Sequence, residues 1–329
     1  MTTHRYLALT GGVGGAKLAL GLSRILSEDE LAFVVNTADD FEHLGLHISP
    51  DIDTLVYTLA NENNLENGWG RRNESWQFMS ALASLGGETW FKLGDKDLAM
   101  NVERSKRLKD GAVLGEVTEE LAKSLGVKHK ILPMSSDPVR TLVHTECGPL
   151  NFQDYFVRER CEPAVQGFEY QGAATAVVNP DITEWLASAK LAGIILCPSN
   201  PYISIDPILS LPKLRTALWN SRVPIIAISP IVGGESLKGP LKKMMCEMSV
   251  STSASWIAEH YRDFIQGLVV DTVDELLMTE IEAIGIAATA TNTVMKTLDD
   301  RVDLARVSLD FVASLRESES YKSVSGLRA

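Results

Sequence analysis

The segment Leu7-Ala8-Leu9-Thr10-Gly11-Gly12-Val13-Gly14-Gly15-Ala16-Lys17 joins an apolar run to two pairs of glycines near the start of the chain. The run from Tyr6 to Leu9 predicts a strand, and the apolar-rich residues 16–26 predict a helix. Glycine between them lets the backbone adopt positive φ and approach a ligand closely. The unpaired N–H groups at the start of the helix favour an anion there. We therefore expect a phosphate or diphosphate beside Gly11, Gly12, Gly14 and Gly15.

The glycine spacing departs from two known phosphate-binding patterns. Gly12-Val13-Gly14 fits the first half of G-x-G-x-x-G, but Lys17 occupies the position of the third glycine. Lys17 is also neither preceded by glycine nor followed by Ser or Thr, as the P-loop pattern requires. Two interpretations stay open: a phosphate-binding loop, or a tight turn that packs the helix on the strand.

The composition is that of a globular protein. The chain has 329 residues, of which 45% are hydrophobic and 22% charged, which is enough for one large α/β unit or two lobes. Its net charge of −12 argues against a broad nucleic-acid surface, although a local basic pocket for a small anion is compatible with it. Four widely spaced cysteines without a C-x-x-C pair indicate reduced thiols in a cytoplasmic protein. There is no signal-peptide pattern and no apolar run of about 18 residues, so we expect no membrane span.

An acidic pair follows the second predicted strand. Residues 31–36 form a continuous apolar run typical of a buried parallel strand, and Asp39 and Asp40 lie just beyond its end. Open α/β sheets bind ligands at the carboxyl ends of their strands. We therefore expect the glycine loop and this acidic pair to share one crevice.

Two further acidic residues, Asp51 and Asp53, lie at the start of a helix predicted over 52–61. Aspartate is favoured at this position as an N-cap, but one cap needs only one aspartate. The second is therefore a candidate functional residue, and Asp53 is the stronger of the two.

The next segment carries basic residues and another predicted helix, over 98–109. Arg71 and Arg72 follow a Gly-Trp-Gly turn, so they belong either to a solvated surface or to an anion contact. Lys92 lies between Phe91 and Leu93 as at the end of a strand, an alternation that can point it into the crevice. Asp97 fits the N-cap of the helix.

The α/β alternation is interrupted between residues 111 and 171. We interpret this stretch as a smaller inserted lobe that covers the crevice, and residues 1–110 and 172–329 as a Rossmann-like core in a single unit. In the core, Ser199 and Asn200 follow a buried strand over 193–197, and polar turns of this kind can offer hydrogen bonds to a nucleotide. The predicted fold is α/β, with a mostly parallel sheet flanked by helices. Later elements include helices over 207–219 and 301–315, and a mobile tail from 317 to 329.

The ordered set of motifs resembles the 2-phospho-L-lactate transferase family of coenzyme F-420 biosynthesis over nearly the whole chain. The motifs are Leu9–Gly15, Val35–Asp40, Ile48–Thr54, Lys92–Asp95, Ile131–Met134, Pro198–Pro201 and Ser229–Ile231. The resemblance implies a magnesium-dependent reaction between a guanosine diphosphate-linked three-carbon acid and the deazaflavin precursor Fo. The terminal ribityl hydroxyl of Fo attacks the phosphorus that carries the acid, and GMP leaves.

The resemblance also implies residue roles. Asp53 and Lys92 match the Fo site of the family, and Asp40 matches the second aspartate of its N-T-x-D-D motif. We assign Asp40 and Asp53 to the metal and to catalysis, and the glycine loop with Ser199 and Asn200 to the nucleotide.

This assignment agrees with the chemistry of the reaction. Attack of an alcohol on a diphosphate requires charge neutralisation and in-line placement, and magnesium takes one or two carboxylates together with phosphate oxygens. One of the carboxylates could also accept the proton of the attacking hydroxyl. His43 and His47 are assigned structural roles.

Three functions remain in comparison. The first is the transferase, for which we expect a cytoplasmic homodimer that binds no nucleic acid. The second is a regulatory protein similar to gluconeogenesis factors, which binds nucleotide sugars. The third is a nicotinamide dehydrogenase, which Lys17 at the third glycine position weakens. The sequence does not decide whether the transferred group derives from phospholactate, phosphoenolpyruvate or 3-phosphoglycerate.

Overall fold

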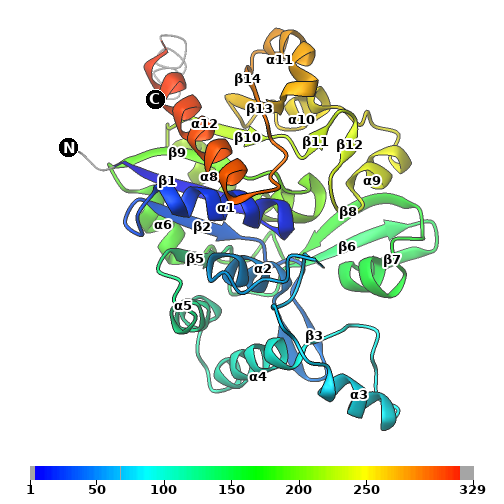
Figure 1. The fold of residues 1–329 in the computed structure, drawn as a ribbon. Helices are drawn as coiled ribbons and strands as arrows, with labels where there is room; N and C mark the ends of the chain where they lie inside the picture. The colour runs from blue at the N-terminus through cyan, green and yellow to red at the C-terminus, as the bar shows by residue number, and fades with distance from the viewer. Residues whose placement is uncertain (1–3, 67, 319–329) are drawn as a thin grey trace.

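The computed structural model describes residues 4–66 and 68–318, and its centre is a seven-stranded sheet in which all neighbouring strands are parallel (Figure 1). In spatial order the strands are β14 (Ala287–Thr291), β13 (Gly267–Asp271), β10 (Ile225–Ile228), β9 (Leu191–Leu196), β1 (Arg5–Thr10), β2 (Leu31–Val35) and β5 (Lys130–Pro133). The predicted α/β fold class is therefore confirmed.

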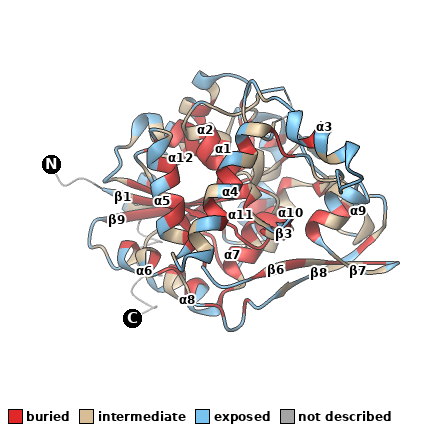
Figure 2. Cartoon of the chain, turned by 90° about the horizontal axis from the view of Figure 1, so that it is seen from below, coloured by how far each residue is buried: buried red, intermediate tan, exposed pale blue. Residues whose placement is uncertain are grey.

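The strands are apolar throughout because helices cover both faces of the sheet. Successive side chains of a strand point to opposite faces, so Leu7 and Leu9 join one core cluster while Tyr6 and Ala8 join the other. Both clusters run across the centre of the molecule, where buried residues concentrate in Figure 2.

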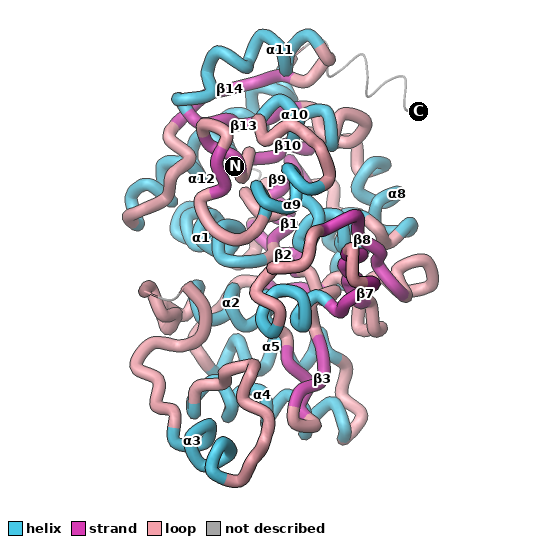
Figure 3. The backbone as a smooth tube through the Cα atoms, turned by 90° about the vertical axis from the view of Figure 1, so that its right-hand side faces the viewer, coloured by secondary structure: helices cyan, strands magenta, loops and turns pink. Residues whose placement is uncertain are grey.

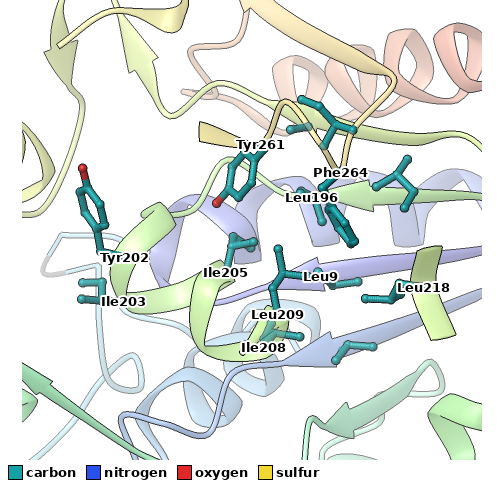
Figure 4. Packing of buried hydrophobic residues seen from close by; sticks show 14 of the residues in the cluster. Leu9, Leu196, Tyr202, Ile203, Ile205, Ile208, Leu209, Leu218, Tyr261 and Phe264 are labelled. Carbon is teal, nitrogen blue, oxygen red and sulfur yellow. The ribbon is translucent and has the colours of Figure 1, made fainter. Parts of the chain in front are cut away.

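Five helices among the described residues contribute buried side chains to the cluster on one face of the sheet. They are α1 (Gly12–Ile25), α2 (Pro50–Leu59), α4 (Asp95–Lys109), α5 (Leu114–Ser124) and α12 (Leu298–Glu317). The other face is covered by η2 (Pro201–Ile205), α6 (Pro180–Leu186), α7 (Asp206–Leu209), α8 (Pro212–Asn220), α9 (Leu241–Glu247), α10 (Ala254–His260) and α11 (Met278–Ala283). Figure 4 shows Ile205, Ile208 and Leu209 of this second layer beside Leu9 and Leu196 of the sheet.

Smaller elements extend from the sheet. The hairpin β3 (Phe41–His43) and β4 (Leu46–Ile48) packs with α3 (Gln77–Ser84) and α4 (Asp95–Lys109) around a small core of Ile48, Met79 and Leu93. This group projects from one end of the molecule in Figures 1 and 3. A separate antiparallel sheet contains β7 (Gly148–Asn151), β6 (Arg140–Thr145) and β8 (Val165–Gln171), with η1 (Asp154–Arg158) between β7 and β8. The remaining elements are β11 (Ile231–Val232), β12 (Glu235–Ser236) and η3 (Thr272–Leu277).

The strand order reverses at β1. From β1 the chain builds outward through β2 to β5 on one side, and through β9, β10, β13 and β14 on the other. At the carboxyl edge of the sheet, the loop after β1 therefore leads to one face of the sheet and the loop after β9 leads to the other, which leaves a crevice between them. In open α/β sheets such a reversal point is where ligands bind.

Part of the predicted inserted lobe belongs to the main sheet. Within the expected range 111–171, β5 pairs with β2 through Phe33 opposite Ile131, and α5 packs into the core. The predicted boundary at residue 111 is therefore wrong, because a short edge strand resembles the start of a separate sheet when only the sequence is known. The antiparallel sheet itself begins at Arg140.

Two other expectations differ in detail. The helix predicted over 207–219 is interrupted at Leu211, which is extended because it precedes Pro212. The last helix, α12, continues to Glu317, and the rest of the predicted tail, 319–329, lies outside the described residues. Among the described residues, no helix is both long and apolar enough to cross a membrane.

Helix α1 packs closely against α12, and this contact yields a first prediction. A Cβ atom on Gly21 would overlap the backbone carbonyl oxygen of Arg301. We expect Gly21→Ala to lower the free energy of unfolding by about 1–3 kcal/mol, because a backbone atom cannot move away as a side chain can. Chemical denaturation measures the change. Gly167→Ala is the control, since nothing lies within 4 Å of its new methyl group, and equal stability of the two variants would contradict the prediction.

Candidate active site

A cavity of about 720 Å³ lies where the strand order reverses. Loops that follow four strands line it: Gly11, Gly12 and Gly14 after β1, Asp39 after β2, Ser199 and Asn200 after β9, and Ser229 after β10. The loops singled out in the sequence therefore meet at one crevice. Asp40 does not line this cavity, but a second cavity of about 420 Å³ that shares Asp39 with the first.

The glycine turn is built into the start of α1, which begins at Gly12 with a φ of +65°. Ser199 holds the turn, since its Oγ donates to the Gly11 carbonyl oxygen at 2.8 Å. Side chains on Gly14 or Gly15 would overlap Pro198 or Thr10. The packing interpretation therefore applies to Gly14 and Gly15 whether or not a ligand binds, whereas a Cβ atom on Gly12 would meet only Ser204 Oγ, at 3.9 Å.

The side chain of Asp51, a residue of α2, binds the start of α1. Its Oδ1 accepts from the Gly12 N–H at 2.7 Å, and its Oδ2 accepts from Asn36 Nδ2 at 2.9 Å. The carboxylate thus stabilises the N-terminus of α1 rather than capping α2, to which it belongs. Burial raises the pKa of Asp51 to about 6, against the opposing effect of these two hydrogen bonds.

Asp53 lines the large cavity and forms a buried ion pair with Arg104 of α4. Arg104 Nη1 donates to Asp53 Oδ2 at 3.1 Å, and Nη2 donates to Oδ1. Burial raises the pKa of Asp53, and the guanidinium opposes this effect. Both oxygens of Asp53, which was assigned to catalysis and to the metal, are therefore already bound by Arg104, and this ion pair disfavours the metal role.

Asp40 is held by its neighbours on β4 and the loop after it. Its Oδ2 accepts from Ser49 Oγ at 2.8 Å and lies 3.1 Å from His47 Nε2. The Oδ1 atoms of Asp39 and Asp40 are buried without a hydrogen-bond partner among the described residues. Burial, and then the charges of Asp51 and Asp40, raise the pKa of Asp39 well above its usual value.

These carboxylates do not form a complete protein metal site. In the part of the chain that the structure describes, no three His, Cys, Asp or Glu side chains are arranged to hold a metal ion. The unpaired Oδ1 atoms of Asp39 and Asp40 nevertheless suit magnesium, which is commonly bound by one or two carboxylates with water and phosphate oxygens.

Aromatic side chains form another wall of the large cavity. Phe152 and Phe156 stack with their ring centroids 5.3 Å apart, and Trp90 and Phe91 contact each other at 5.7 Å. Lys92 is exposed at this wall, with no hydrogen bond or ion pair to the rest of residues 4–66 and 68–318. Such a wall suits a flat ring with polar substituents.

Cations line the cavity near the glycine turn. Lys17 of α1 donates to the Met295 carbonyl oxygen at 3.0 Å, and Lys238 also faces the cavity. Burial lowers the pKa of Lys17, and the charge of Lys238 lowers it further, as expected for two cations that share one region. By contrast, Arg71 and Arg72 pair with Glu62 at 3.4 and 2.8 Å and do not line the cavity.

Several lining residues were missed or misinterpreted at the level of sequence. Asp97 was taken for a helix cap, yet it is buried and lines the cavity. Trp90, Phe152 and Phe156 come from separate segments, and no local pattern joins them. Lys92 lines the cavity as expected, but residues 91–93 are not a strand, and Phe91 lines the cavity as well.

The fold and the cavity define a Rossmann-like α/β protein with a large cavity at the reversal point of a parallel sheet. Residues 7–306 match the family model described as 2-phospho-L-lactate transferase CofD. The chain belongs to this transferase family.

Individual relatives are similar over nearly their full length. The 2-phospho-L-lactate transferase of Methanosarcina mazei is 38% identical, with 92% of this chain and 98% of the relative covered. The phosphoenolpyruvate transferase of Streptomyces griseus is 36% identical, with 95% and 99% covered. A solved UPF0052-family structure from Bacillus halodurans aligns with a TM-score of 0.60 at 13% identity, covering 94% of this chain and 99% of that one, and supports the fold alone.

The raised pKa of Asp51 predicts a pH effect on stability. Between an unfolded value near 4 and the folded value of about 6, the folded state binds more protons than the unfolded state. Stability should therefore fall as the pH rises through this window, by up to about 3 kcal/mol for this group. Asp51→Asn keeps an acceptor for Gly12 but carries no charge.

Chemical denaturation at pH 4, 5, 6 and 7 tests this effect. We expect the wild type to lose stability relative to Asp51→Asn up to about pH 6, with little change above it. A stability difference that does not vary with pH would contradict the assignment.

Proposed function

We propose that this protein transfers a phosphorylated three-carbon acid from a guanosine diphosphate-linked donor to the terminal ribityl hydroxyl of Fo. The hydroxyl oxygen bonds to the phosphorus that carries the acid, the bond from this phosphorus to the GMP oxygen breaks, and GMP leaves. The product is the phosphodiester precursor of coenzyme F-420.

The observation that carries this proposal is the division of the large cavity into two chemically different walls. One has the glycine turn, Lys17 and Lys238, which suit a nucleotide diphosphate, and the other has stacked aromatic rings beside Lys92. A charged nucleotide and a flat deazaflavin need surfaces of these two kinds. Family membership supports the same pair of substrates.

In this proposal the residues of the chain act mainly by orientation and charge. The start of α1, Ser199 and Asn200 hold the diphosphate, while Lys92 and the aromatic wall hold the acceptor. Asp39 and Asp40 would hold magnesium, which neutralises charge on the phosphate oxygens when bound. Asp53, which Arg104 holds in a fixed orientation, would contact the acceptor Fo. A carboxylate of this group accepts the proton of the attacking hydroxyl.

The proposal specifies the transferred group only as a phosphorylated three-carbon acid. The relatives carry names based on 2-phospho-L-lactate and on phosphoenolpyruvate, at 38% and 36% identity, so similarity does not select one of them. Mass spectrometry of the product formed from Fo and each guanylylated acid identifies the acid directly. We also propose a homodimer, which light scattering tests: a mass near that of one 36.0 kDa chain would contradict it.

The reaction and its metal requirement give one prediction. We expect GMP release only when Fo, a guanylylated acid and magnesium are all present. Asp40→Asn should lower turnover by about 10² or more, because one metal ligand is lost, while the thermal transition is kept. Glu42→Gln is the matched control, because this carboxylate lies two residues away at the same smaller cavity but is exposed, whereas Asp40 is buried.

The outcomes of the GMP assay separate the alternatives. Unchanged turnover in Asp40→Asn would remove this residue from the metal site. No GMP release with any donor, together with tight binding of a nucleotide sugar, would favour the regulatory function instead.

The acceptor assignment gives another prediction. Lys92→Ala should weaken Fo binding by about tenfold to a hundredfold, because a hydrogen bond to a charged group is lost. GDP binding should stay within a few-fold, since Lys92 lies at the aromatic wall. Fluorescence titration of Fo, with GDP binding measured in parallel, provides the test. Normal Fo binding with loss of GDP binding would mean that the two substrates occupy opposite positions.

A further inference from the structure

Asp97 lies in the first turn of α4 but is not needed to cap this helix. Glu74 performs that role: its Oε2 accepts from the Lys96 N–H at 2.8 Å, and its Oε1 accepts from the Asp97 N–H at 2.9 Å. The Asp97 side chain is instead buried, with 9% exposure, and lines the large cavity. Its position therefore needs an explanation other than helix capping.

Only part of the Asp97 carboxylate is satisfied by the residues that the structure describes. Tyr57 Oη donates to Oδ1 at 2.6 Å, and Oδ2 makes no hydrogen bond to the described chain. The nearby guanidinium of Arg104 is already bound to Asp53 and Asn101. Burial, together with the charge of Asp53, raises the pKa of Asp97 to about 7. The Oδ2 atom of this cavity-lining side chain therefore remains available to accept a hydrogen bond from a ligand.

The position of Asp97 associates it with the acceptor rather than the nucleotide. Its partner Tyr57 belongs to α2, as does Asp51, which binds the start of α1. Tyr57 lies six residues after Asp51, a rise of about 9 Å along the helix. In the chain, Asp97 follows the cavity-lining residues Phe91 and Lys92 closely. The Asp97 carboxylate, with Oδ2 unpaired in the described chain, and the Lys92 cation thus line the same cavity as the aromatic side chains.

We propose that Asp97 determines specificity for the acceptor by accepting a hydrogen bond from the N–H of the pyrimidinedione edge of the deazaflavin ring. This inference rests on the proposed function. Such an edge presents one N–H between two carbonyl oxygens, so a carboxylate can bind the N–H while Lys92 donates to a carbonyl. A ring without this N–H leaves the carboxylate unpaired, and sites of this kind reject such analogues strongly.

The experiment compares Fo with its N3-methyl derivative, in which this N–H is replaced. Each ligand is titrated by fluorescence against the wild type, Asp97→Ala and the control Asp95→Asn. Asp95 lies in the same helical turn but binds Ser75 and the N–H groups of Gln77 and Phe78, outside the cavity. Melting temperature and GDP binding are recorded for every variant to verify the fold.

We expect wild type and Asp95→Asn to bind Fo about tenfold to a hundredfold more tightly than the methyl derivative. In Asp97→Ala this ratio should fall to within about threefold, with GDP binding unchanged. If the alanine variant does not fold, Asp97→Asn replaces it, and its ratio should lie below that of the wild type because a neutral acceptor binds more weakly.

Two results would overturn the inference. One is equal binding of Fo and its N3-methyl derivative by the wild type. The other is a folded Asp97 variant that prefers Fo over the methyl derivative by the same ratio as the wild type. If the wild type binds neither ligand in the presence of GDP, the proposed function fails, and the inference fails with it. The failure of the inference alone, with tight Fo binding retained, leaves the proposed function intact.

Discussion

The hydrogen bonds of the Asp51 carboxylate join the segments on which the cavity depends. One oxygen binds the N–H of Gly12 at the start of α1, and the other binds Asn36 at the end of β2. Asn36 in turn donates to the Ile203 carbonyl oxygen of η2 at 3.0 Å. A single buried side chain thus fixes the first helix, the second strand, α2 and the segment after β9 relative to one another. Without it, a partly positive helix start and a buried amide would face each other unpaired.

This arrangement also changes how the glycine turn can bind an anion. The Gly12 N–H, which a phosphate could use, already has an acidic partner within the protein. A phosphate must therefore bind the remaining N–H groups of the first turn, or replace Asp51. Lys17 and Lys238 at the same wall supply positive charge that does not depend on this N–H. In the proposed function, side-chain charge would therefore contribute to nucleotide binding as well as the helix start.

The fold could be predicted from the sequence because its signals are local. Apolar runs such as residues 31–35 identify buried strands, and the chain order of strands and helices identifies a parallel sheet. The lining of the cavity was predicted where it follows strand ends, as for Gly12 and Ser199, but Asp39 lines the large cavity in place of Asp40, to which the metal was assigned. It was misjudged where burial and partners decide the role: Asp51 binds a helix distant in sequence, Asp53 is paired with Arg104, and Asp97 is not a cap. Nothing in the sequence around Asp53 indicates that Arg104, 51 residues away, will bind it.

The charge of the cavity gives a physical reason why a cation belongs to the proposed reaction. Asp39, Asp51, Asp53 and Asp97 line the same space, and among them only Asp53 has a guanidinium bound to its carboxylate in the described chain. A diphosphate brought beside these groups would be repelled strongly, since buried charges are poorly screened. Either the carboxylates take up protons, as the raised pKa of Asp51 and Asp97 permits, or a divalent ion lies between them and the phosphate. Lys17 and Lys238 would offset part of the charge of a diphosphate, and a bound magnesium ion would relieve both the remaining repulsion from the aspartates and the charge on the phosphate oxygens. The four aspartates of the lining therefore favour the magnesium complex of a nucleotide over the bare nucleotide.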